Sequence, residues 1–441
     1  MFYKKDRDDV SILETHHSHH RVYPSRWLQL LVYVLATFAN AMASGTFAPI
    51  ISHVTIFYNV SVTAINSLAI VFLFLYPVGT SLSIWLSRKL RLRMIMIIGS
   101  LANLGILFRF LSLINPLQGY AALMIGQILC AVGKPFFLNA AALFAARWFD
   151  PSQRDIATSI SSMANPLGLA IGTLAPSLII SGNETTTNDF YILYGSEGGF
   201  TLLTTILVIF IFRSDPPTPP STSEEHHQSI DLKRDFIKLM TNVHYLTLLF
   251  GFSLGLAVFN ALTTLLAQLI EPTGYRSDAA GAFGAGIIVA GLINAFLVGI
   301  IMDKTHAYRI ILRVLLIGAC LSGLFFVLVL RPDEYYLLAI AIGLMGFFLL
   351  PLLPVTFECA VECTYPIRPE WSTGLLLCIG NILSGIFIFV LEYLISLASI
   401  YQSGHVFTPA AIFILSIFVL SGLILFTYRG PYLRLLADRD S

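Results

Sequence analysis

Twelve apolar runs, each long enough to cross a lipid bilayer as a helix, occupy most of this 441-residue chain. Only 12% of the residues are charged, against about 25% in a soluble domain. A helix satisfies its own backbone hydrogen bonds, so it is the structure expected for such runs in lipid. The chain is therefore predicted to be an all-α, multi-pass membrane protein with spans near 27–51, 64–86, 94–113, 120–146, 155–181, 194–213, 244–270, 280–302, 308–330, 335–357, 372–398 and 406–428.

Basic residues are distributed unequally between the two sides of these spans. The loops on one side contain only Arg276 and Arg331, whereas the loops and tails on the other side contain nearly all the remaining lysines and arginines. Because basic loops stay inside, both termini are predicted to be cytoplasmic. The two N-x-S/T sequences, at Asn59 and Asn183, fall in predicted outer loops and are candidate glycosylation sites. We expect the plasma membrane, with a vacuolar, lysosomal or other organelle membrane as the alternative.

The cysteines and histidines give little indication of a metal or redox role. None of the five cysteines falls in a predicted outer segment, so no disulfide framework is expected. Cys359 and Cys363 are four residues apart, but two cysteines without further ligands do not make a metal site. The N-terminal HHSHH run is interpreted as a solvated tail, with metal or haem-iron binding as the alternative. No metal, cofactor or nucleic-acid partner is expected.

A polar segment divides the twelve spans into two sets of six. It contains SDPPTPPSTSEEHH, whose proline, serine and charge content is typical of a flexible linker. Parallel six-span repeats with a site at their interface are the plan of the major facilitator superfamily. The predicted domains are a cytoplasmic tail at 1–26, a six-helix bundle at 27–213, a cytoplasmic linker at 214–243, a second six-helix bundle at 244–428 and a cytoplasmic tail at 429–441.

Lys134 lies near the middle of the fourth span, where a charge is expensive. A central charge costs at least ~2.5 kcal/mol on insertion scales. It is tolerated if it faces a wet cavity or a partner. Lys134 is therefore a candidate substrate-binding residue, and a structural ion pair or hydrogen bonds to carbonyls are the alternative.

Several motifs resemble the feline leukaemia virus subgroup C receptor-related proteins, solute carrier family 49 of the major facilitator superfamily. The most specific is LPVTFECAVECTYP at 353–366, followed by STGLL at 372–376. Further matches are Arg26-Trp27, Gly126-Gln127, Trp148-Phe149, Asn165-Pro166-Leu167-Gly168 and the run from Gly299 to Asp303. The resemblance implies a solute carrier, and members of the family are reported to move choline and ethanolamine, with haem and a vitamin also proposed. We expect the carrier to be a monomer.

The resemblance also locates positions where this chain departs from the choline carriers. Those carriers cage the quaternary ammonium between aromatic residues of spans one and seven. By alignment, Ser44 and Asn260 occupy these positions, Pro166 replaces a pocket glutamine, and Lys134 replaces another. Fewer aromatic faces and an added cation disfavour a cationic ligand. We therefore expect an anionic or zwitterionic small solute, with choline, ethanolamine or haem as the alternatives.

Polar residues at matching depth in the spans are the candidate lining of the cavity that the resemblance implies. In lipid, an amide or hydroxyl either faces water or forms hydrogen bonds with another helix, and both readings stay open for each. Besides Lys134, the candidates are Asn40, Ser44, Asn165, Asn260, Thr264, Asn294 and Asn381.

Four acidic residues are candidates for gating or coupling. Glu358 and Glu362 are one helical turn apart. They are predicted to form a latch with basic residues of the loop between the eighth and ninth spans (the 8–9 loop), or else to be a solvated helix end. Asp303 belongs to the superfamily's cytoplasmic gating motif in that loop, according to the resemblance. Glu392, interpreted as the main acidic group inside a span, would carry a coupling proton or pair with a basic residue.

The expected function is secondary transport of a small organic solute by alternating access. An enzyme is not expected, because neither H-E-x-x-H nor G-x-S-x-G occurs. A receptor or sensor without turnover is the other alternative, although such proteins usually add a sizeable extramembrane domain.

Overall fold

The computed structural model describes residues 23–180, 186–218, 232–270, 277–331, 334–400 and 408–439. Every regular element within these ranges is a helix. The N-terminal histidines and the candidate glycosylation site Asn183 lie outside the described residues. Asn59 is described; it is exposed and ends α2 (Ile51–Tyr58) in the left-handed conformation, with φ of 52°.

Twelve helices of the structure are long and apolar enough to cross a membrane, which confirms the predicted number of spans. The limits shift at two places that matter below. The sixth span begins at Thr187 rather than near 194, and the tenth continues to Thr364 rather than ending near 357. The spans are Ser25–Ile50, Thr63–Ser87, Leu92–Ser112, Gln118–Trp148, Arg154–Ile179, Thr187–Phe210, Val243–Leu266, Ala282–Thr305, Tyr308–Val329, Tyr335–Thr364, Trp371–Ile395 and Pro409–Phe426.

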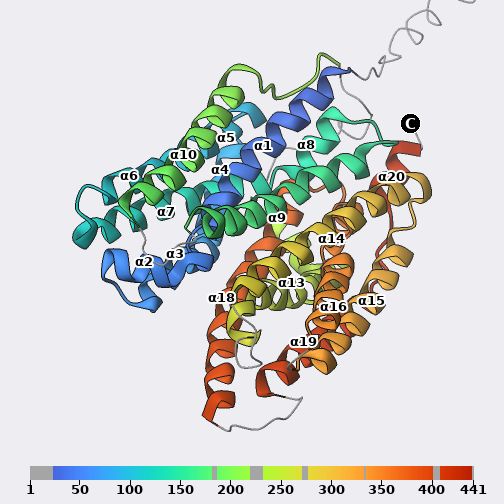
Figure 1. Ribbon diagram of the computed structural model, residues 1–441. Coiled ribbons are helices and arrows are strands. Elements are labelled where there is room, and N and C mark those ends of the chain that lie inside the picture. The colour runs from blue at the N-terminus through green and yellow to red at the C-terminus, as the bar shows by residue number, and fades with distance from the viewer. Residues whose placement is uncertain are drawn as a thin grey trace, which may run out of the picture.

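Two helical bundles lie side by side and are built from successive halves of the chain (Figure 1). The first contains α1 (Ser25–Gly45), α2, α3 (Val62–Phe74), α4 (Tyr76–Ser87), α5 (Leu92–Asn103), α6 (Phe108–Ser112), α7 (Pro116–Leu138), α8 (Ala141–Trp148), α9 (Arg154–Ile179) and α10 (Thr187–Phe210). The second contains α13 (Val243–Ile270), α14 (Ser277–Thr305), α15 (Tyr308–Val329), α16 (Tyr335–Leu349), α17 (Leu352–Thr364), α18 (Pro369–Ile400) and α19 (Pro409–Phe426).

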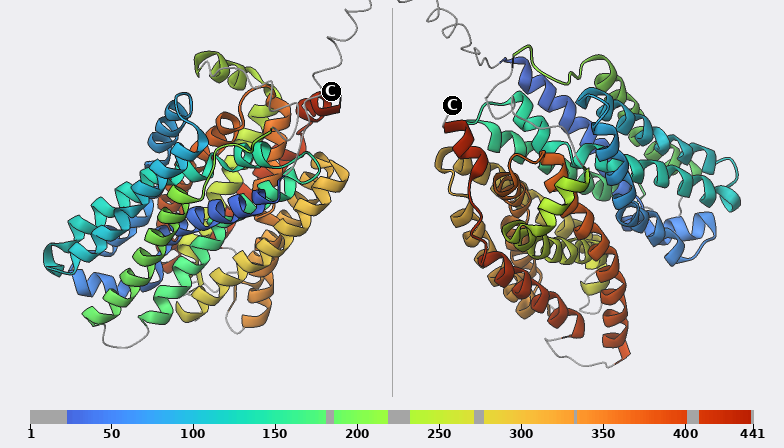
Figure 2. Two further views of the ribbon diagram at one scale, coloured as in Figure 1. Left: turned by 90° about the horizontal axis from the view of Figure 1, so that it is seen from above. Right: turned by 180° about the vertical axis from the view of Figure 1, so that it is seen from behind.

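The bundles meet along two pairs of contacts. Helix α9 packs against α14, and α18 packs against α3 and α4. The start of α1 and the C-terminal helix α20 (Leu433–Arg439) lie at one end of the molecule, called here the terminus-bearing end (Figure 1). The bundles lie closest there and diverge toward the opposite end, as the views in Figures 1 and 2 both show.

Two regions that were predicted to be irregular contain helices. The predicted linker includes α12 (Leu232–Thr241), and the predicted C-terminal tail includes α20. Helix α12 is amphipathic, with basic residues among apolar ones, and α20 packs against α17. The proline-rich composition of the linker concealed α12, and the shortness of α20 left no clear sequence period.

Close approach of α1 and α9 depends on glycines of α9. A Cβ added at Gly172 would lie 2.3 Å from the carbonyl oxygen of Met42, and one at Gly168 would lie 2.4 Å from that of Phe38. Without apolar attraction between helices in lipid, such backbone proximity supplies the van der Waals packing that associates them. The small residues therefore hold the first span against the fifth, which carries part of the cavity described below.

We expect Gly172→Ala to lower the thermal stability of the purified protein by about 1–3 kcal/mol, the usual cost of overpacking. The matched control is Gly199→Ala in α10, where an added Cβ meets nothing within 4 Å. Melting curves in detergent would show a loss for the first variant and none for the second. Equal melting temperatures for the two variants would contradict this account of the α1–α9 contact.

Candidate functional site

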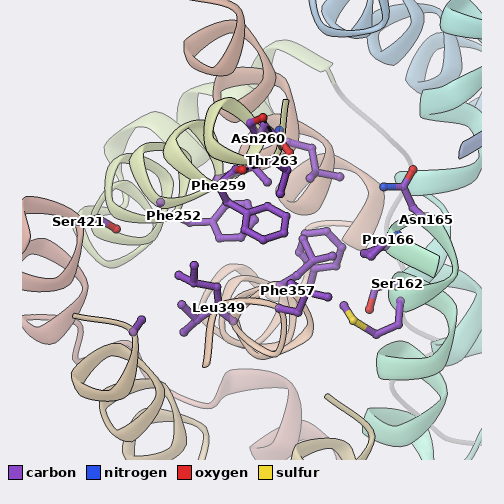
Figure 3. Close-up of a pocket in the computed structure, with 18 of the residues that line it drawn as sticks. Ser162, Asn165, Pro166, Phe252, Phe259, Asn260, Thr263, Leu349, Phe357 and Ser421 are labelled. Atoms are coloured by element: carbon purple, nitrogen blue, oxygen red, sulfur yellow. Dashed lines mark hydrogen bonds between the residues drawn. The ribbon is translucent and has the colours of Figure 1, made fainter. Parts of the chain in front are cut away.

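A cavity of about 1210 Å³, counting the open solvent at its mouth, lies between the bundles (Figure 3). The first bundle contributes α7 and α9 to its wall, and the second contributes residues from α13 to α19. The wall is mainly apolar with a few polar side chains, which is the usual character of a small-molecule site. Four predicted residues line it: Lys134, Asn165, Asn260 and Asn381.

Lys134 reaches the cavity from α7, one residue before a proline inside that helix. A proline ring disrupts the helix that precedes it, and α7 ends at Leu138, shortly after Pro135. The Nζ atom lies 5.9 Å from the centre of the Phe72 ring. Within the described part of the chain, Lys134 makes no side-chain hydrogen bond and no ion pair. The structure thus gives it a place at the cavity and no structural counter-ion.

Asn165 is the second polar residue of the first bundle whose side chain is open. It is partly exposed on α9, beside Pro166, and both residues line the cavity (Figure 3). No hydrogen bond of the Asn165 amide is found among the described residues. Ser162, one turn earlier on the same helix, donates instead to the carbonyl oxygen of Thr158 at 2.6 Å. Lys134 and Asn165 therefore present unused polar groups to the cavity from one bundle.

The polar residues of the second bundle form hydrogen bonds within that bundle. The Asn260 amide donates to the Ser384 hydroxyl at 3.0 Å, and the Asn381 amide donates to the carbonyl oxygen of Leu377 at 2.7 Å. Thr263, which the sequence analysis did not single out, lines the cavity, and its hydroxyl donates to the carbonyl oxygen of Phe259 at 3.0 Å. These side chains both line the cavity and form hydrogen bonds within the second bundle.

The other four predicted polar residues lie away from this cavity. Asn40 donates to Asn103 and to the carbonyl oxygen of Cys130, both at 2.9 Å, and so joins helices. Asn294 likewise joins α14 to α16 through the carbonyl oxygen of Phe347 at 2.7 Å. The hydroxyls of Ser44 and Thr264 are bonded to carbonyl oxygens of their own helices. Span depth alone does not reveal which way a helix is turned, so the four predictions of cavity lining do not hold here.

Aromatic side chains form a part of the wall that the sequence analysis missed. Phe252 and Phe259 come from α13 and Phe357 from α17, all in the second bundle (Figure 3). The first two are seven residues apart, which places them on one face of a helix. That spacing was a usable signal, but phenylalanine is so frequent in these spans that it does not stand out, with 33 in the chain.

A buried charge cluster lies inside the first bundle, separate from the cavity. Arg109 pairs with Glu197, and both are nearly inaccessible to solvent. Arg109 also donates to the Thr46 hydroxyl at 3.1 Å and to Gln127 at 3.2 Å, and it lies 4.8 Å from the centre of the Phe47 ring. Every charge in this cluster has a partner, so the cluster is structural in its geometry.

This cluster corrects the interpretation of Glu392. Glu392 is exposed on α18, and no ion pair of it is found among the described residues. Glu197 is instead a buried acidic residue inside the sixth span. It was missed because the sixth span was predicted to begin near 194, which left Glu197 close to a helix end instead of within a helix beginning at Thr187.

Asp303 connects the two bundles at the terminus-bearing end. Its carboxylate accepts hydrogen bonds from the backbone N–H groups of Asp155 and Ile156, at 2.8 and 3.0 Å. These groups begin α9, where unpaired N–H groups and the helix dipole favour a negative charge. A second hydrogen bond also joins the two bundles: the Tyr308 hydroxyl of α15 donates to the Asp155 carboxylate of α9 at 2.9 Å. Both contacts hold α9 of one bundle against the α14–α15 corner of the other.

Glu358 and Glu362 pair with a residue that the sequence analysis did not consider. Both are buried on α17, and both form ion pairs with Arg434 of the C-terminal helix α20. The backbone N–H of Leu435 also donates to Glu362 at 3.1 Å. The predicted partner, the basic 8–9 loop, is therefore wrong, and so is the alternative of a solvated helix end. The error follows from treating residues 429–441 as a tail.

The two carboxylates also shape the chemistry of Arg434. Burial by itself would lower the pKa of the guanidinium, but the charges of Glu358 and Glu362 outweigh it and raise the pKa above its ordinary value. Tyr432, just before α20, lies 4.7 Å from the Arg309 guanidinium and 5.3 Å from the Tyr308 ring. The C-terminal segment is thus packed onto the same corner that Tyr308 joins to Asp155.

The chain is similar to known membrane transporters over most of its length. Residues 33–365 match the model of the Major Facilitator Superfamily. "Solute carrier family 49 member A3" of Xenopus tropicalis is 32% identical over 85% of this chain and 79% of its own length. The chain belongs to solute carrier family 49 of the Major Facilitator Superfamily. The resemblance seen in the sequence is therefore confirmed.

A further relative and a solved structure are also similar to this chain. "Choline/ethanolamine transporter FLVCR2" of Homo sapiens is 29% identical over 84% of this chain and 70% of its own length. The outward-conformation crystal structure of the transporter FucP matches 92% of this chain and all of its own, with a TM-score of 0.70 at 14% identity, which shows the fold alone. The family and these relatives confirm the prediction that the chain is a secondary transporter of a small solute. Its family and its fold are those of transporters, which are not enzymes.

The Arg109–Glu197 pair yields a stability prediction. Arg109→Met leaves Glu197 buried without its counter-ion, which typically costs about 3–5 kcal/mol. The double variant Arg109→Met/Glu197→Met removes both charges and should recover much of that loss, because no unpaired charge remains. Melting curves of the two variants and the wild type would test this. A double variant less stable than Arg109→Met would show that the pair does more than cancel its own charges.

Proposed function

We propose that this carrier moves an anionic or zwitterionic small organic solute by alternating access, with Lys134 contacting the negative group. The observation that carries the proposal is a lysine of the cavity wall without an ion-pair partner among the described residues. A charge inside a membrane protein is tolerated when it faces a wet cavity or a partner. A substrate carboxylate would be that partner.

The main alternative is choline or ethanolamine, the substrates in the printed name of FLVCR2. A cation held at ~4 Å from the Lys134 ammonium would meet a repulsion of about 4 kcal/mol at an effective dielectric of ~20. The aromatic side chains in the wall are phenylalanines, which are weaker cation–π partners than tryptophan and do not offset this repulsion: Phe252, Phe259, Phe357 and Phe418. A non-transporting receptor or sensor is the other alternative.

We expect small carboxylates to stabilise the wild-type protein against heat, and Lys134→Gln to abolish that effect. A ligand at 100 times its dissociation constant stabilises by ~2.7 kcal/mol, which a melting curve detects. Lys134→Arg keeps the charge and should retain part of the response. Lys233→Gln on α12, an exposed lysine outside the cavity, is the matched control and should behave as wild type.

The same melting curves should include choline and ethanolamine. If choline stabilised wild type and Lys134→Gln alike, the anionic substrate would be wrong and the FLVCR2 substrates would apply to this chain as well. Flux of the stabilising solute in proteoliposomes then separates a transporter from a receptor without turnover.

Gating at the terminus-bearing end is proposed to use Asp303, Tyr308 and the acidic pair of α17. The contacts of Asp303 and Tyr308 with the start of α9 support a latch that closes this end. We call these contacts between α9 and the α14–α15 corner the joint. Arg434 stabilises the joint by neutralising the charges of Glu358 and Glu362 beside it. The basic composition of this side supports a cytoplasmic location for the latch. A monomer in the plasma membrane remains our working expectation.

Tyr308→Phe and Arg434→Gln should open the terminus-bearing end. A hydrogen bond to a charged group is worth about 1.5–3 kcal/mol, so its loss shifts a two-state equilibrium about tenfold or more. Cys320 lines the cavity and is partly exposed, so its alkylation by a membrane-impermeant maleimide, followed by peptide mass spectrometry, reports access.

The maleimide is added from the side that carries the termini. Both variants should label faster than wild type. Thr305→Ala should not, because the Thr305 hydroxyl bonds to Ile301 and Ala307 of the same bundle and makes no hydrogen bond across the joint to a described residue. Unchanged labelling in both variants would refute the latch.

A further inference from the structure

The two halves of the cavity wall differ in chemistry, and this difference bears on the substrate. The first bundle supplies Lys134 and Asn165, whose polar atoms form no hydrogen bond or ion pair with described residues. The second bundle supplies four phenylalanines, at 252, 259, 357 and 418, and a set of aliphatic side chains. Three of these phenylalanines are labelled in Figure 3. We propose that the substrate is an amphipathic organic monoanion, with its charged head on the first bundle and its apolar body on the second. This inference rests on the proposed function and narrows it.

The position of the head follows from which hydrogen-bond donors are free. The amides of Asn260 and Asn381 each use one N–H in a bond within the second bundle, and the hydroxyl of Ser421 donates to the carbonyl oxygen of Gly251 at 2.7 Å. A carboxylate placed there would find one remaining N–H on each amide, no positive charge, and phenyl rings nearby. Beside Lys134 and Asn165 it meets an ammonium and a free amide, and an opposite charge nearby favours the charged form of both groups. The head therefore belongs on α7 and α9.

The number of charges follows from the same wall. Lys134 is the sole charged side chain among the described residues that line the cavity. A second carboxylate on the substrate would have no counter-ion in a mainly apolar cavity, and burying an unpaired charge is expensive. A dianion, such as a dicarboxylate or haem with its two propionates, is thereby disfavoured relative to a monoanion with the same apolar body.

The nature of the body follows from the opposite wall. Phe252, Phe259 and Phe357 are joined there by leucines of α16 and α17, including Leu349 and Leu353. Hydroxyl groups buried against such side chains would lose their hydrogen bonds to water without replacement. A sugar acid is therefore a poor fit, whereas an aromatic or branched hydrocarbon body gains contact area. Because head and body attach to different bundles, only such a solute links the two across the cavity.

The test is a ligand series on the purified full-length protein, read by thermal stabilisation and converted to apparent dissociation constants. The probes are acetate, butyrate, 3-phenylpropionate, gluconate, succinate and the neutral amide of 3-phenylpropionate. Affinity should rise about fourfold for each buried methylene added to the monocarboxylate. Gluconate, succinate and the neutral amide should each bind at least tenfold more weakly than 3-phenylpropionate.

Variants assign the two ends of the ligand. Phe259→Ala should lower the affinity for 3-phenylpropionate at least tenfold and leave the affinity for acetate unchanged. Phe259→Leu fills more of the space and controls for a folding defect in the alanine variant. Phe250→Ala is the matched control, since Phe250 lies on the same helix but is 55% exposed and does not line the cavity. Lys134→Gln should weaken every monocarboxylate.

The outcomes separate this inference from the proposed function. Equal affinity for gluconate and 3-phenylpropionate, with both lost in Lys134→Gln, overturns the apolar body and leaves the anion site standing. Equal affinity for 3-phenylpropionate and its neutral amide, unaffected by Lys134→Gln, overturns the anion site itself. Failure of every carboxylate to bind the wild-type protein overturns both.

Discussion

The absence of water inside a bilayer is the constraint on which the rest of this structure depends. Backbone groups there must bond to one another, which explains why all described elements are helices. Side-chain charges obey the same constraint. Arg109 and Glu197 meet inside the first bundle, and Arg434 meets two glutamates of α17 at the terminus-bearing end. Lys134 of the cavity wall differs from these charges because it has no ion-pair partner among the residues that the structure describes, and this difference indicates a ligand.

The two bundles use polar groups for different purposes. In the second bundle, the amides and hydroxyls that line the cavity also bond within that bundle, so they contribute to its rigidity. In the first bundle, Lys134 and Asn165 each precede a proline inside a helix, and their polar groups form no hydrogen bond with described residues. One bundle thus offers a shaped apolar wall and the other offers the charge. A transporter that must release its substrate benefits when neither half binds it fully alone.

The closed end is held by few but well-placed contacts. A carboxylate of one bundle caps the start of a helix of the other, and a tyrosine of the same corner binds the first acidic residue of that helix. These bonds join helices of different bundles, so opening of this end would require all of them to break. The C-terminal helix matters here because Arg434 cancels two buried negative charges beside the joint. Without it, carboxylates on both sides of the joint would face one another across a medium of low dielectric.

Sequence alone determined the number of spans, the fold and the family, because span length, hydropathy and the LPVTFECAVECTYP motif are local properties of the chain. It also singled out Lys134, since a central charge is visible without knowing the fold. Tertiary structure decided which polar residues share the cavity: Asn165, Asn260 and Asn381 line it, while Asn40 and Asn294 join helices. Helix rotation sets that choice, and rotation depends on packing between distant segments. The pairing of Arg434 with Glu358 and Glu362 has the same origin, because more than 70 residues of chain separate groups that only the folded bundle brings together.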